Sequence, residues 1–255
     1  MIVNGMKLFT GIDGCRAGWL AVSLNEDFNW NPRSMAIFSV HELIYLCDAS
    51  ELVLADIPMG LKSTGPPERT CDREARMMLW KRRGSIFPVP VRMAVYADGY
   101  EKACLINSSI AGKKISKQSW NICGKIREMD EFLFQNPRCI KKLKETSPEL
   151  CLMILNGNQA LSFSKKTEDG RKERLRILEY YAIQAKAIYQ YTLHIFKRRD
   201  VTGDDILDAM ALAVSAVLIH KYGLTGIPEK PEYDERGIAM QIVIPNNICP
   251  GLSSP

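Results

Sequence analysis

The first sixty residues constrain the fold most, because their strand and helix patterns alternate in an order that few architectures accept. Three short strand patterns follow one another: "KLFTGIDG", "GWLAVSL" and "SMAIFS". A helical pattern, "VHELIYLCDA", and an almost continuous apolar strand, "ELVLADIPMGL", come next. A continuous apolar strand is typical of the centre of a sheet that is covered on both faces. This order predicts an α/β fold with a mixed sheet of about five strands in the order 3-2-1-4-5, flanked by helices, with strand 2 antiparallel.

The remaining two hundred or so residues contain mainly helical patterns. We expect helices at 67–83, at "SWNICGKIREMDEFLF" and at 167–191, and strands within "RCIKKLKETSPEL" and "GIAMQIVIP". No internal repeat and no linker composition is visible. The sequence therefore predicts a single domain over 1–255, with residues 60–138 as a largely helical insertion over the site.

Two of the early strand patterns end in a carboxylate. Asp13 closes "FTGIDG" and Asp56 closes "LVLADIP". Because Asp is disfavoured inside apolar strands, each needs a reason. Asp13 can be a turn residue between Gly11 and Gly14. In an α/β sheet, however, the ends of central strands are where functional sites are built.

A late apolar helix, "GDDILDAMALAVSAVLI" over residues 203–219, begins with three acids. Asp204 or Asp205 can cap the helix and meet the positive end of its dipole. Asp208 lies beyond the cap on an apolar face, where a buried carboxylate needs a cation, a basic partner or water. Asp205 and Asp208 leave the same face of the helix, as two ligands of one divalent cation do. Capping and metal binding both remain open for this turn.

Together these acids match the requirements of a two-metal phosphodiester-cleaving site. Such a site needs carboxylates from separate elements to hold two Mg²⁺ or Mn²⁺ ions. We expect Asp13 to contact both ions, Asp56 to bind one, and Asp205 with Asp208 to bind the other. Asp204 is then left as the helix cap.

The strand order and the acidic helix resemble the RNase H superfamily, and "DDILDA" resembles the helix of its Holliday-junction resolvase branch. Eight ordered motifs further resemble the family called domain of unknown function 429, regarded as predicted nucleases of RNase H fold: "GIDGCRAGW", "ADIPMGL", "RTCDREAR", "GSIFPVPVR", "SKQSWNICGKIREMD", "ETSPE", "SKKTEDGR" and "DDILDA". The resemblance implies an RNase H-like sheet and a metal-dependent nuclease that hydrolyses nucleic acid. It carries the ligand role onto Asp13, Asp56, Asp205 and Asp208. Activity follows from it only by analogy.

The "ETSPE" motif adds two further candidate residues, Glu145 and Glu149. The family more usually shows a His in the place of Ser147, which can offer only a hydroxyl contact. A role in the site and a role as acids at a helix start around Pro148 both remain open.

The positive charge of the chain is concentrated in one segment. Between Lys62 and Arg92 there are eight basic and three acidic residues, a surplus equal to the whole net charge of +5. Arginines at helical spacing in this segment form a predicted stripe that binds the phosphates of a nucleic acid or of a phosphorylated substrate. The predicted substrate-binding residues are Arg69, Arg73, Arg76, Arg83, Lys166 and Arg171, with Lys165 and Arg174 as additions. A solvated charged face paired with Asp72 and Glu74 is the alternative, and Trp80, Phe87 and Tyr96 are more typical of a core than of a base-stacking platform.

The sequence gives little support for disulfides, a zinc site, secretion or a membrane span. The eight cysteines form no C-x-x-C pair and the three histidines show no zinc-ligand spacing, so we expect reduced, mostly buried thiols. The opening residues show no secretory pattern and no apolar run is long enough to span a bilayer, so we expect a cytoplasmic protein without membrane partners.

Two other functions remain as alternatives to the nuclease. One is a non-catalytic nucleic-acid or nucleotide-binding protein that keeps the fold. The other is an actin-like or sugar-kinase-type phosphotransferase, because "GIDGCRAG" also resembles the phosphate loop of those enzymes. Their second phosphate loop and adenosine-binding Gly-Gly turn are missing from this sequence.

Overall fold

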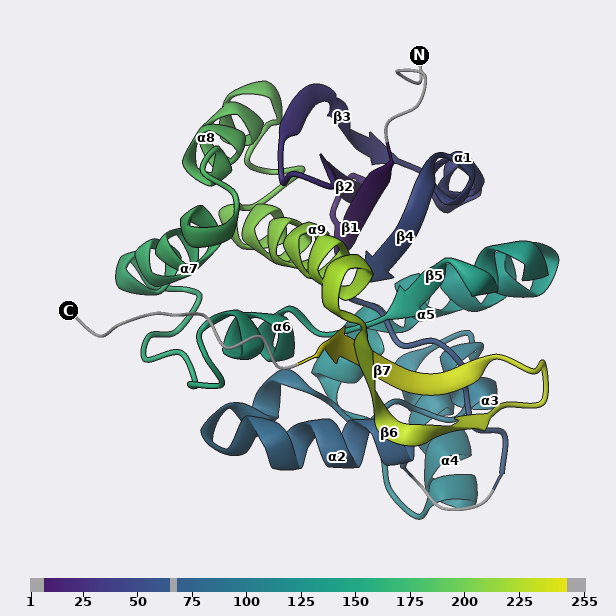
Figure 1. Cartoon of the computed structure of the whole chain (residues 1–255). Coiled ribbons are helices and arrows are strands. Elements are labelled where there is room, and N and C mark those ends of the chain that lie inside the picture. Colours follow the sequence, from purple (N-terminus) through teal and green to yellow (C-terminus); the bar gives the residue numbers. More distant parts are fainter. Residues whose placement is uncertain (1–6, 65–67, 247–255) are drawn as a thin grey trace. The chain divides into compact units, whose positions relative to one another are not determined.

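The computed structural model describes residues 7–64 and 68–246, and its strands form a seven-stranded sheet in the order β3-β2-β1-β4-β5-β7-β6 (Figure 1). The strands are β1 (Leu8–Cys15), β2 (Gly18–Asn25), β3 (Trp30–Phe38), β4 (Ser50–Ala55), β5 (Leu143–Glu145), β6 (Leu224–Tyr233) and β7 (Ala239–Pro245). Strand β2 is antiparallel to β1 and β3, whereas β4 is parallel to both β1 and β5. The predicted order 3-2-1-4-5, with its antiparallel second strand, is confirmed.

The described residues contain more helices than the five that the sequence patterns predict, and their bounds differ as well. They are α1 (Leu43–Ala49), α2 (Thr70–Leu79), α3 (Arg92–Val95), α4 (Tyr100–Ala111), α5 (Lys117–Gln135), α6 (Pro148–Leu155), α7 (Glu168–Tyr181), α8 (Ala185–Ile195) and α9 (Gly203–Tyr222), with short 3₁₀ helices η1 (Val40–Glu42), η2 (Trp80–Ser85) and η3 (Pro137–Lys141). Two expected helices are therefore shorter than the sequence patterns indicate. The helix expected at 67–83 is α2 followed by η2. The helix expected at 167–191 is interrupted at Ala182, whose extended backbone ends α7 without any Gly or Pro signal.

The strand expected in "RCIKKLKETSPEL" is much shorter than predicted. Its first part forms η3, and only Leu143–Glu145 pairs with β4. Pro148 then stands in the first turn of α6, where its fixed φ suits a helix start and its missing N–H costs nothing.

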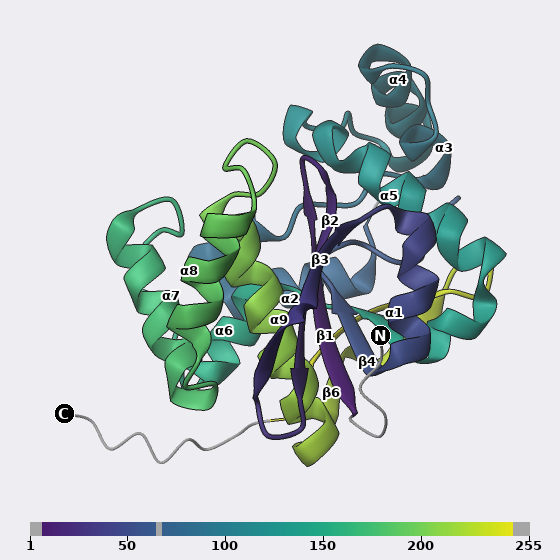
Figure 2. The same cartoon turned by 90° about the horizontal axis from the view of Figure 1, so that it is seen from above.

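The chain divides into two compact units, and each is described by itself. Unit 1 contains described residues 7–56, 141–225 and 243–246. Its core surrounds α9, which is buried from Ile206 to Ile219 and apolar over that stretch except at Asp208 and Ser215. Helices α6, α7 and α8 pack against α9, and α9 packs against β1, β2 and β4. Figure 2 shows α1 on the other face of these strands, so both faces of the central strand β4 are covered, as its apolar sequence predicts.

Unit 2 contains Ile57–Ile140 and Gly226–Ile242. Helices α3, α4 and α5 enclose a small apolar cluster there. A buried network holds its elements together: Arg92 bonds Asp130 (N–O 3.0 Å) and Asp234 (N–O 2.5 Å), and Asp130 also accepts from Arg236 at 2.8 Å. Two buried carboxylates are thus paired with two guanidinium groups. The prediction of a single domain with an insertion at 60–138 stays a prediction.

Two further expectations concern membranes and thiols. Across residues 7–64 and 68–246, none of the helices combines the length and the apolar character needed to cross a membrane. Seven cysteines are buried and form no disulfide, whereas Cys249 lies outside the described residues. The expected burial is confirmed at those seven positions, and their reduced state stays a prediction.

Candidate functional site

Three acids lie toward the carboxyl ends of the neighbouring strands β1, β4 and β5. The parallel register aligns Ile12 of β1 with Ala55 of β4, and Ala55 with Glu145 of β5. The Asp56 N–H donates to the Ile12 carbonyl oxygen at 3.1 Å. The parallel pairing of β1 with β4 stops at Ile12, so Asp13 lies just beyond it, still within β1 and opposite Leu20 of β2, while Asp56 follows the last residue of β4 and Glu145 is the last residue of β5. The three acids therefore lie toward the carboxyl ends of adjacent parallel strands, where α/β proteins build their sites.

Helix α9 reaches the same edge by packing directly on β1. A Cβ added at Gly11 would lie 2.1 Å from the Ala209 carbonyl oxygen and 2.4 Å from the Ala213 nitrogen. Only a residue without a side chain permits this approach. Gly11 precedes Asp13 by two residues and Ala209 follows Asp208, so the contact fixes the acidic turn of α9 beside the end of β1.

The start of α9 differs from the expectation that Asp204 caps it. Thr202 is the N-cap residue: its hydroxyl accepts from the Asp205 N–H at 3.3 Å, and Asp205 Oδ2 accepts from the Thr202 N–H at 2.8 Å. This reciprocal pair is a capping box. The prediction for Asp204 is therefore wrong, and Asp205 supports the helix in addition to its candidate role as a ligand.

The four predicted ligands act on one another electrostatically. Burial raises the pKa of the Asp13 carboxyl well above its usual value, and the charges of Asp56 and Asp208 raise it further. Asp205 adds to the same effect. Burial also raises the pKa of Asp56 to about 7, with Asp208 the next cause. Burial likewise raises the pKa of Asp205 and of Asp208. Ionising these groups together is costly without a cation, so the cluster has the electrostatics of a cation site.

Lys165 supplies a positive charge to this cluster. Its Nζ donates to Asp208 Oδ2 at 2.7 Å, and the ammonium is partly exposed whereas Asp208 is buried. Burial would lower the pKa of Lys165, but Asp208, Asp56 and Asp13 together raise it above its ordinary value. Sequence reasoning assigned Lys165 only to phosphate binding and missed this partner. The signal available was its place in the "SKKTEDGR" motif.

The "SKKTEDGR" segment holds Lys165 in a tight turn before α7. The Thr167 hydroxyl donates to the Ser164 carbonyl oxygen at 2.8 Å and accepts from the Gly170 N–H at 3.1 Å. A Cβ at Gly170 would lie 1.9 Å from the Ser164 carbonyl oxygen. The motif thus supplies the hydroxyl of Thr167 and the glycine at position 170 that this turn requires. These contacts fix the backbone from which the Lys165 side chain extends.

The "ETSPE" residues are all buried in unit 1. Glu149 forms an ion pair with Arg174 at 2.9 Å, and Arg174, which is 0 % exposed, also donates to the Gly170 carbonyl oxygen at 3.1 Å. Glu149 and Arg174 therefore tie α6 to α7. The charges of Glu145 and Glu149 also contribute to raising the pKa of Asp56, although burial and Asp208 contribute more. Both glutamates border the aspartate cluster.

The donor set suits a hard divalent cation, because every candidate ligand atom is a carboxylate oxygen. Within residues 7–64 and 68–246, no three of the four aspartates bring carboxylate oxygens to within 4.8 Å of one another. Binding one ion through three of them would require their side chains to rearrange. The residues suit a divalent cation in chemistry and charge, and the prediction of Mg²⁺ or Mn²⁺ stays a prediction.

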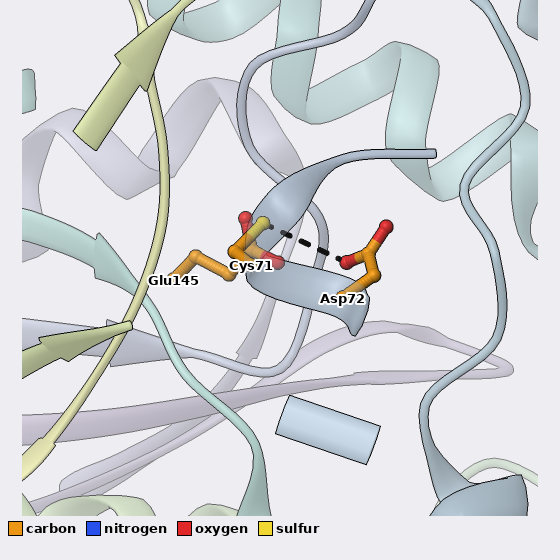
Figure 3. Close-up of side chains that lie close together, drawn as sticks. All are labelled: Cys71, Asp72 and Glu145. Carbon is orange, nitrogen blue, oxygen red and sulfur yellow. Dashed lines mark hydrogen bonds between the residues drawn. The ribbon is translucent and has the colours of Figure 1, made fainter. Parts of the chain in front are cut away.

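The predicted arginine stripe is incomplete. Arg69 is 2 % exposed, and its guanidinium donates to both Asp72 oxygens and to the Met59 carbonyl oxygen. Figure 3 shows Asp72 beside Cys71 on the first turn of α2. The Cys71 thiol donates to Asp72 at 3.7 Å. The figure also labels Glu145, which belongs to unit 1. The expectation that Arg69 belongs to an exposed phosphate-binding stripe is therefore wrong, because a buried carboxylate neutralises it.

The other predicted substrate-binding residues are at least partly accessible. Arg73 and Arg83 are exposed, while Arg76 is half-buried in an ion pair with Glu68. Lys166 is exposed and Arg171 is half-buried in unit 1. Their role in substrate binding stays a prediction.

Comparison with known proteins places this chain in a family. The family described as protein of unknown function DUF429 matches residues 11–233. The chain belongs to the DUF429 family. The match includes all four aspartates, Lys165 and the basic segment, which confirms the family resemblance seen in the sequence. No curated protein and no solved structure matches the chain.

Proposed function

We propose that unit 1 of this DUF429 protein hydrolyses phosphodiester bonds of nucleic acid with the help of divalent cations. The observation that carries the proposal is the grouping of aspartates from β1, β4 and α9 near the carboxyl ends of the parallel strands: Asp56, Asp208 and Asp205 raise the pKa of Asp13, and Asp208 raises that of Asp56. Such strongly perturbed carboxylates are costly to stability, and they concentrate at functional sites. An RNase H-like nuclease arrangement is the best-supported use of them.

Asp13, Asp56, Asp205 and Asp208 would hold Mg²⁺ or Mn²⁺, with two ions expected. Bound ions would activate water and stabilise the charge that develops on the phosphate and the leaving oxygen. Each aspartate contributes through its fixed backbone: Asp13 and Asp56 at adjacent strand ends, and the other two on the first turns of a helix whose approach Gly11 permits. The backbone positions are set in this way, and the carboxylate side chains would adjust when an ion binds.

Lys165 would neutralise part of the aspartate charge and contact a phosphate oxygen of the substrate. Its ammonium is partly exposed and its pKa is raised, so it stays charged at neutral pH. A compact ammonium on a flexible stem suits such a change of partner.

The proposal is tested by nuclease assays with Asp13→Asn, which keeps the side-chain shape and removes the charge. We expect Mn²⁺ or Mg²⁺ to support cleavage of single-stranded, duplex or junction substrates of DNA or RNA, and EDTA to abolish it. The variant should lose activity by about 100-fold or more. Asp204→Asn, on the neighbouring turn, is the matched control and should retain activity. Absence of cleavage on every substrate would favour the non-catalytic binding alternative.

A further inference from the structure

A second site is suggested by a pocket in unit 2 that lies over α2 and η2. Its volume is about 820 Å³, within the range of about 300–1,000 Å³ that small-ligand sites occupy. Four basic residues and two apolar ones line most of it: Arg73, Arg76, Lys81, Arg83, Met77 and Trp80. The pocket combines a large aromatic ring with cations.

Trp80 presents its ring to solvent in this pocket. It is 76 % exposed and its pocket neighbour Met77 is 70 % exposed, whereas Trp19 is fully buried. The expectation that Trp80 belongs to a core is wrong. An indole left in water loses the free energy that burial would give it, so its exposure indicates a binding role more than a structural one.

The backbone at Trp80 is also unusual. Its φ is 42°, in a region that residues with a side chain seldom adopt. Strain of this kind costs on the order of 1–3 kcal/mol and concentrates at binding sites. Because the exposed ring is packed against little that could offset the strain, the strain itself is a second sign of function at this position.

The charge around Trp80 is strongly positive. The acid lining the pocket, Glu68, already forms an ion pair with Arg76. Lys81 and Arg83 are exposed, and neither forms an ion pair with another residue of the described ranges 7–64 and 68–246. These cations are available to anions, and arginine in particular binds phosphate through two parallel hydrogen bonds.

From these observations we infer that the pocket binds single-stranded nucleic acid, with an unpaired base stacked on Trp80 and the adjacent phosphates on Arg73, Lys81 and Arg83. Exposed aromatic rings beside cations are the general means of holding single strands, because every base has a π face and each nucleotide carries a phosphate. Bases inside a duplex already cover one another's faces, so they cannot stack on Trp80. The inference rests on the proposed function for its choice of substrate class and specifies the strandedness of that substrate.

Binding is measured apart from cleavage, so that the two proposals can fail separately. The full chain carrying Asp13→Asn is titrated in EDTA against a fluorescein-labelled single-stranded oligothymidylate, and anisotropy is recorded. Trp80→Ala should weaken binding by about 5-fold to 150-fold, the range for loss of one stacked base. Trp80→Phe keeps a ring and should restore most of the affinity.

The phosphate contact is tested by Arg83→Ala against a control of equal charge. Arg83→Ala should weaken binding and reduce the slope of log K against log salt by about 0.7, the value for one phosphate on a single strand. Arg127→Ala removes one exposed positive charge from α5 of the same unit and should leave the slope unchanged. An equal loss in both arginine variants, or wild-type affinity in Trp80→Ala, would overturn the site.

Two further ligands decide what the pocket recognises. The matched duplex should bind more weakly than the single strand, and equal affinity would overturn stacking on Trp80. Free thymidine monophosphate should compete only weakly. If it binds as tightly as the oligonucleotide, the pocket takes a free nucleotide and the polymer assignment is wrong. Trp80-dependent binding without any nuclease activity would leave this site standing and remove the proposed function alone.

Discussion

At the scale of single residues, the ion pair between Lys165 and Asp208 is the contact that most shapes the aspartate cluster. Asp208 is buried and carries a raised pKa in spite of its ammonium partner at 2.7 Å. Removing the partner leaves a buried carboxylate uncompensated, whereas a divalent cation would replace the lost charge. Lys165 therefore acts as the resident positive charge of this site.

Lys165→Gln should accordingly make stability more dependent on metal. In EDTA we expect a loss of about 1–2 kcal/mol of unfolding free energy, a modest value because the ammonium is partly exposed and screened by solvent. Mn²⁺ should stabilise this variant more than the wild type in urea denaturation. Lys166→Gln changes the exposed neighbour and should behave as wild type. An equal response to Mn²⁺ in all three proteins would remove Lys165 from the cluster.

The aspartates also predict how stability depends on pH. An aspartate whose pKa is higher in the folded state than in the unfolded chain binds its proton more tightly when folded. Its contribution to stability is fully present below the unfolded pKa, near about 4, and is lost as pH rises through the folded pKa. For Asp56 the folded pKa is about 7. The metal-free protein should therefore lose stability between about pH 4 and pH 7.

Urea denaturation in EDTA at several pH values measures this loss. Asp56→Asn removes one of the titrating groups and should flatten the dependence. Saturating Mn²⁺ should oppose the loss, because cations bind the ionised carboxylates. Constant or rising stability over this range in EDTA would mean that the aspartates are not buried together.

The amino-acid types and their local sequence context predicted some residues of the candidate site and missed others. Asp13 and Asp56 could be found because an acid at the end of an apolar strand is locally unfavourable, and Asp208 because it interrupts an apolar helix face. The partner of Asp208 could not be found, because Lys165 is 43 residues away in sequence and no local rule joins them. Arg69 was misassigned for a similar reason: helical spacing places it on a stripe but does not report that Asp72 neutralises it.

At the scale of elements, the contact of α9 with β1 at Gly11 positions the acidic turn. Gly11→Ala places a methyl group within 2.4 Å of two backbone atoms of α9, and backbone cannot move aside cheaply. We expect a loss of about 1–3 kcal/mol or more, measured by urea denaturation, together with weaker binding of Mn²⁺.

Gly124→Ala is the matched control for this change. Nothing lies within 4 Å of a Cβ at Gly124, which is exposed in the middle of α5. Alanine there should stabilise the protein by about 0.5–1 kcal/mol, because glycine is unfavourable inside a helix. The two substitutions should thus have opposite signs, and a harmless Gly11→Ala would contradict the close packing of α9 on β1.

The turn from α2 into η2 offers a different test of strain. Trp80→Gly relieves the positive φ while removing a ring that is mostly exposed, so thermal stability should rise or stay unchanged. The same variant should lose binding of the single-stranded oligonucleotide. A clear drop in melting temperature would show that Trp80 is a packing residue after all.

Element order was predictable, and element ends were less so. The strand, strand, strand, helix, strand pattern of the first sixty residues indicated the order 3-2-1-4, because strands joined by short turns pair antiparallel and a strand that follows a helical crossover pairs parallel; the later strand pattern near residue 143 completed it. The break between α7 and α8 was not predictable, because neither Gly nor Pro marks it. The residues at the break, Ala182 and Ala185, are buried in the core. Tertiary packing decided that boundary.

At the scale of the whole molecule, the net charge of the basic segment suggested more exposed positive side chains than the structure has. The surplus between Lys62 and Arg92 equals the whole net charge of the chain. In unit 2, however, Arg69 and Arg92 are paired with buried carboxylates that hold the fold together. Charge counted along a sequence cannot distinguish such structural arginines from those that face solvent. Within this segment the exposed cations Arg73, Lys81 and Arg83 line the pocket at Trp80.

The central claim is that the four aspartates of unit 1 form a divalent-cation site, and calorimetric titration of the full chain with Mn²⁺ tests it most directly. The account predicts two Mn²⁺ ions bound per wild-type chain, with proton release that grows as pH falls toward the pKa of Asp56. It predicts that Asp13→Asn loses this binding while Asp204→Asn keeps it. Absence of Mn²⁺ binding to the wild type, or equal binding by Asp13→Asn, would contradict it.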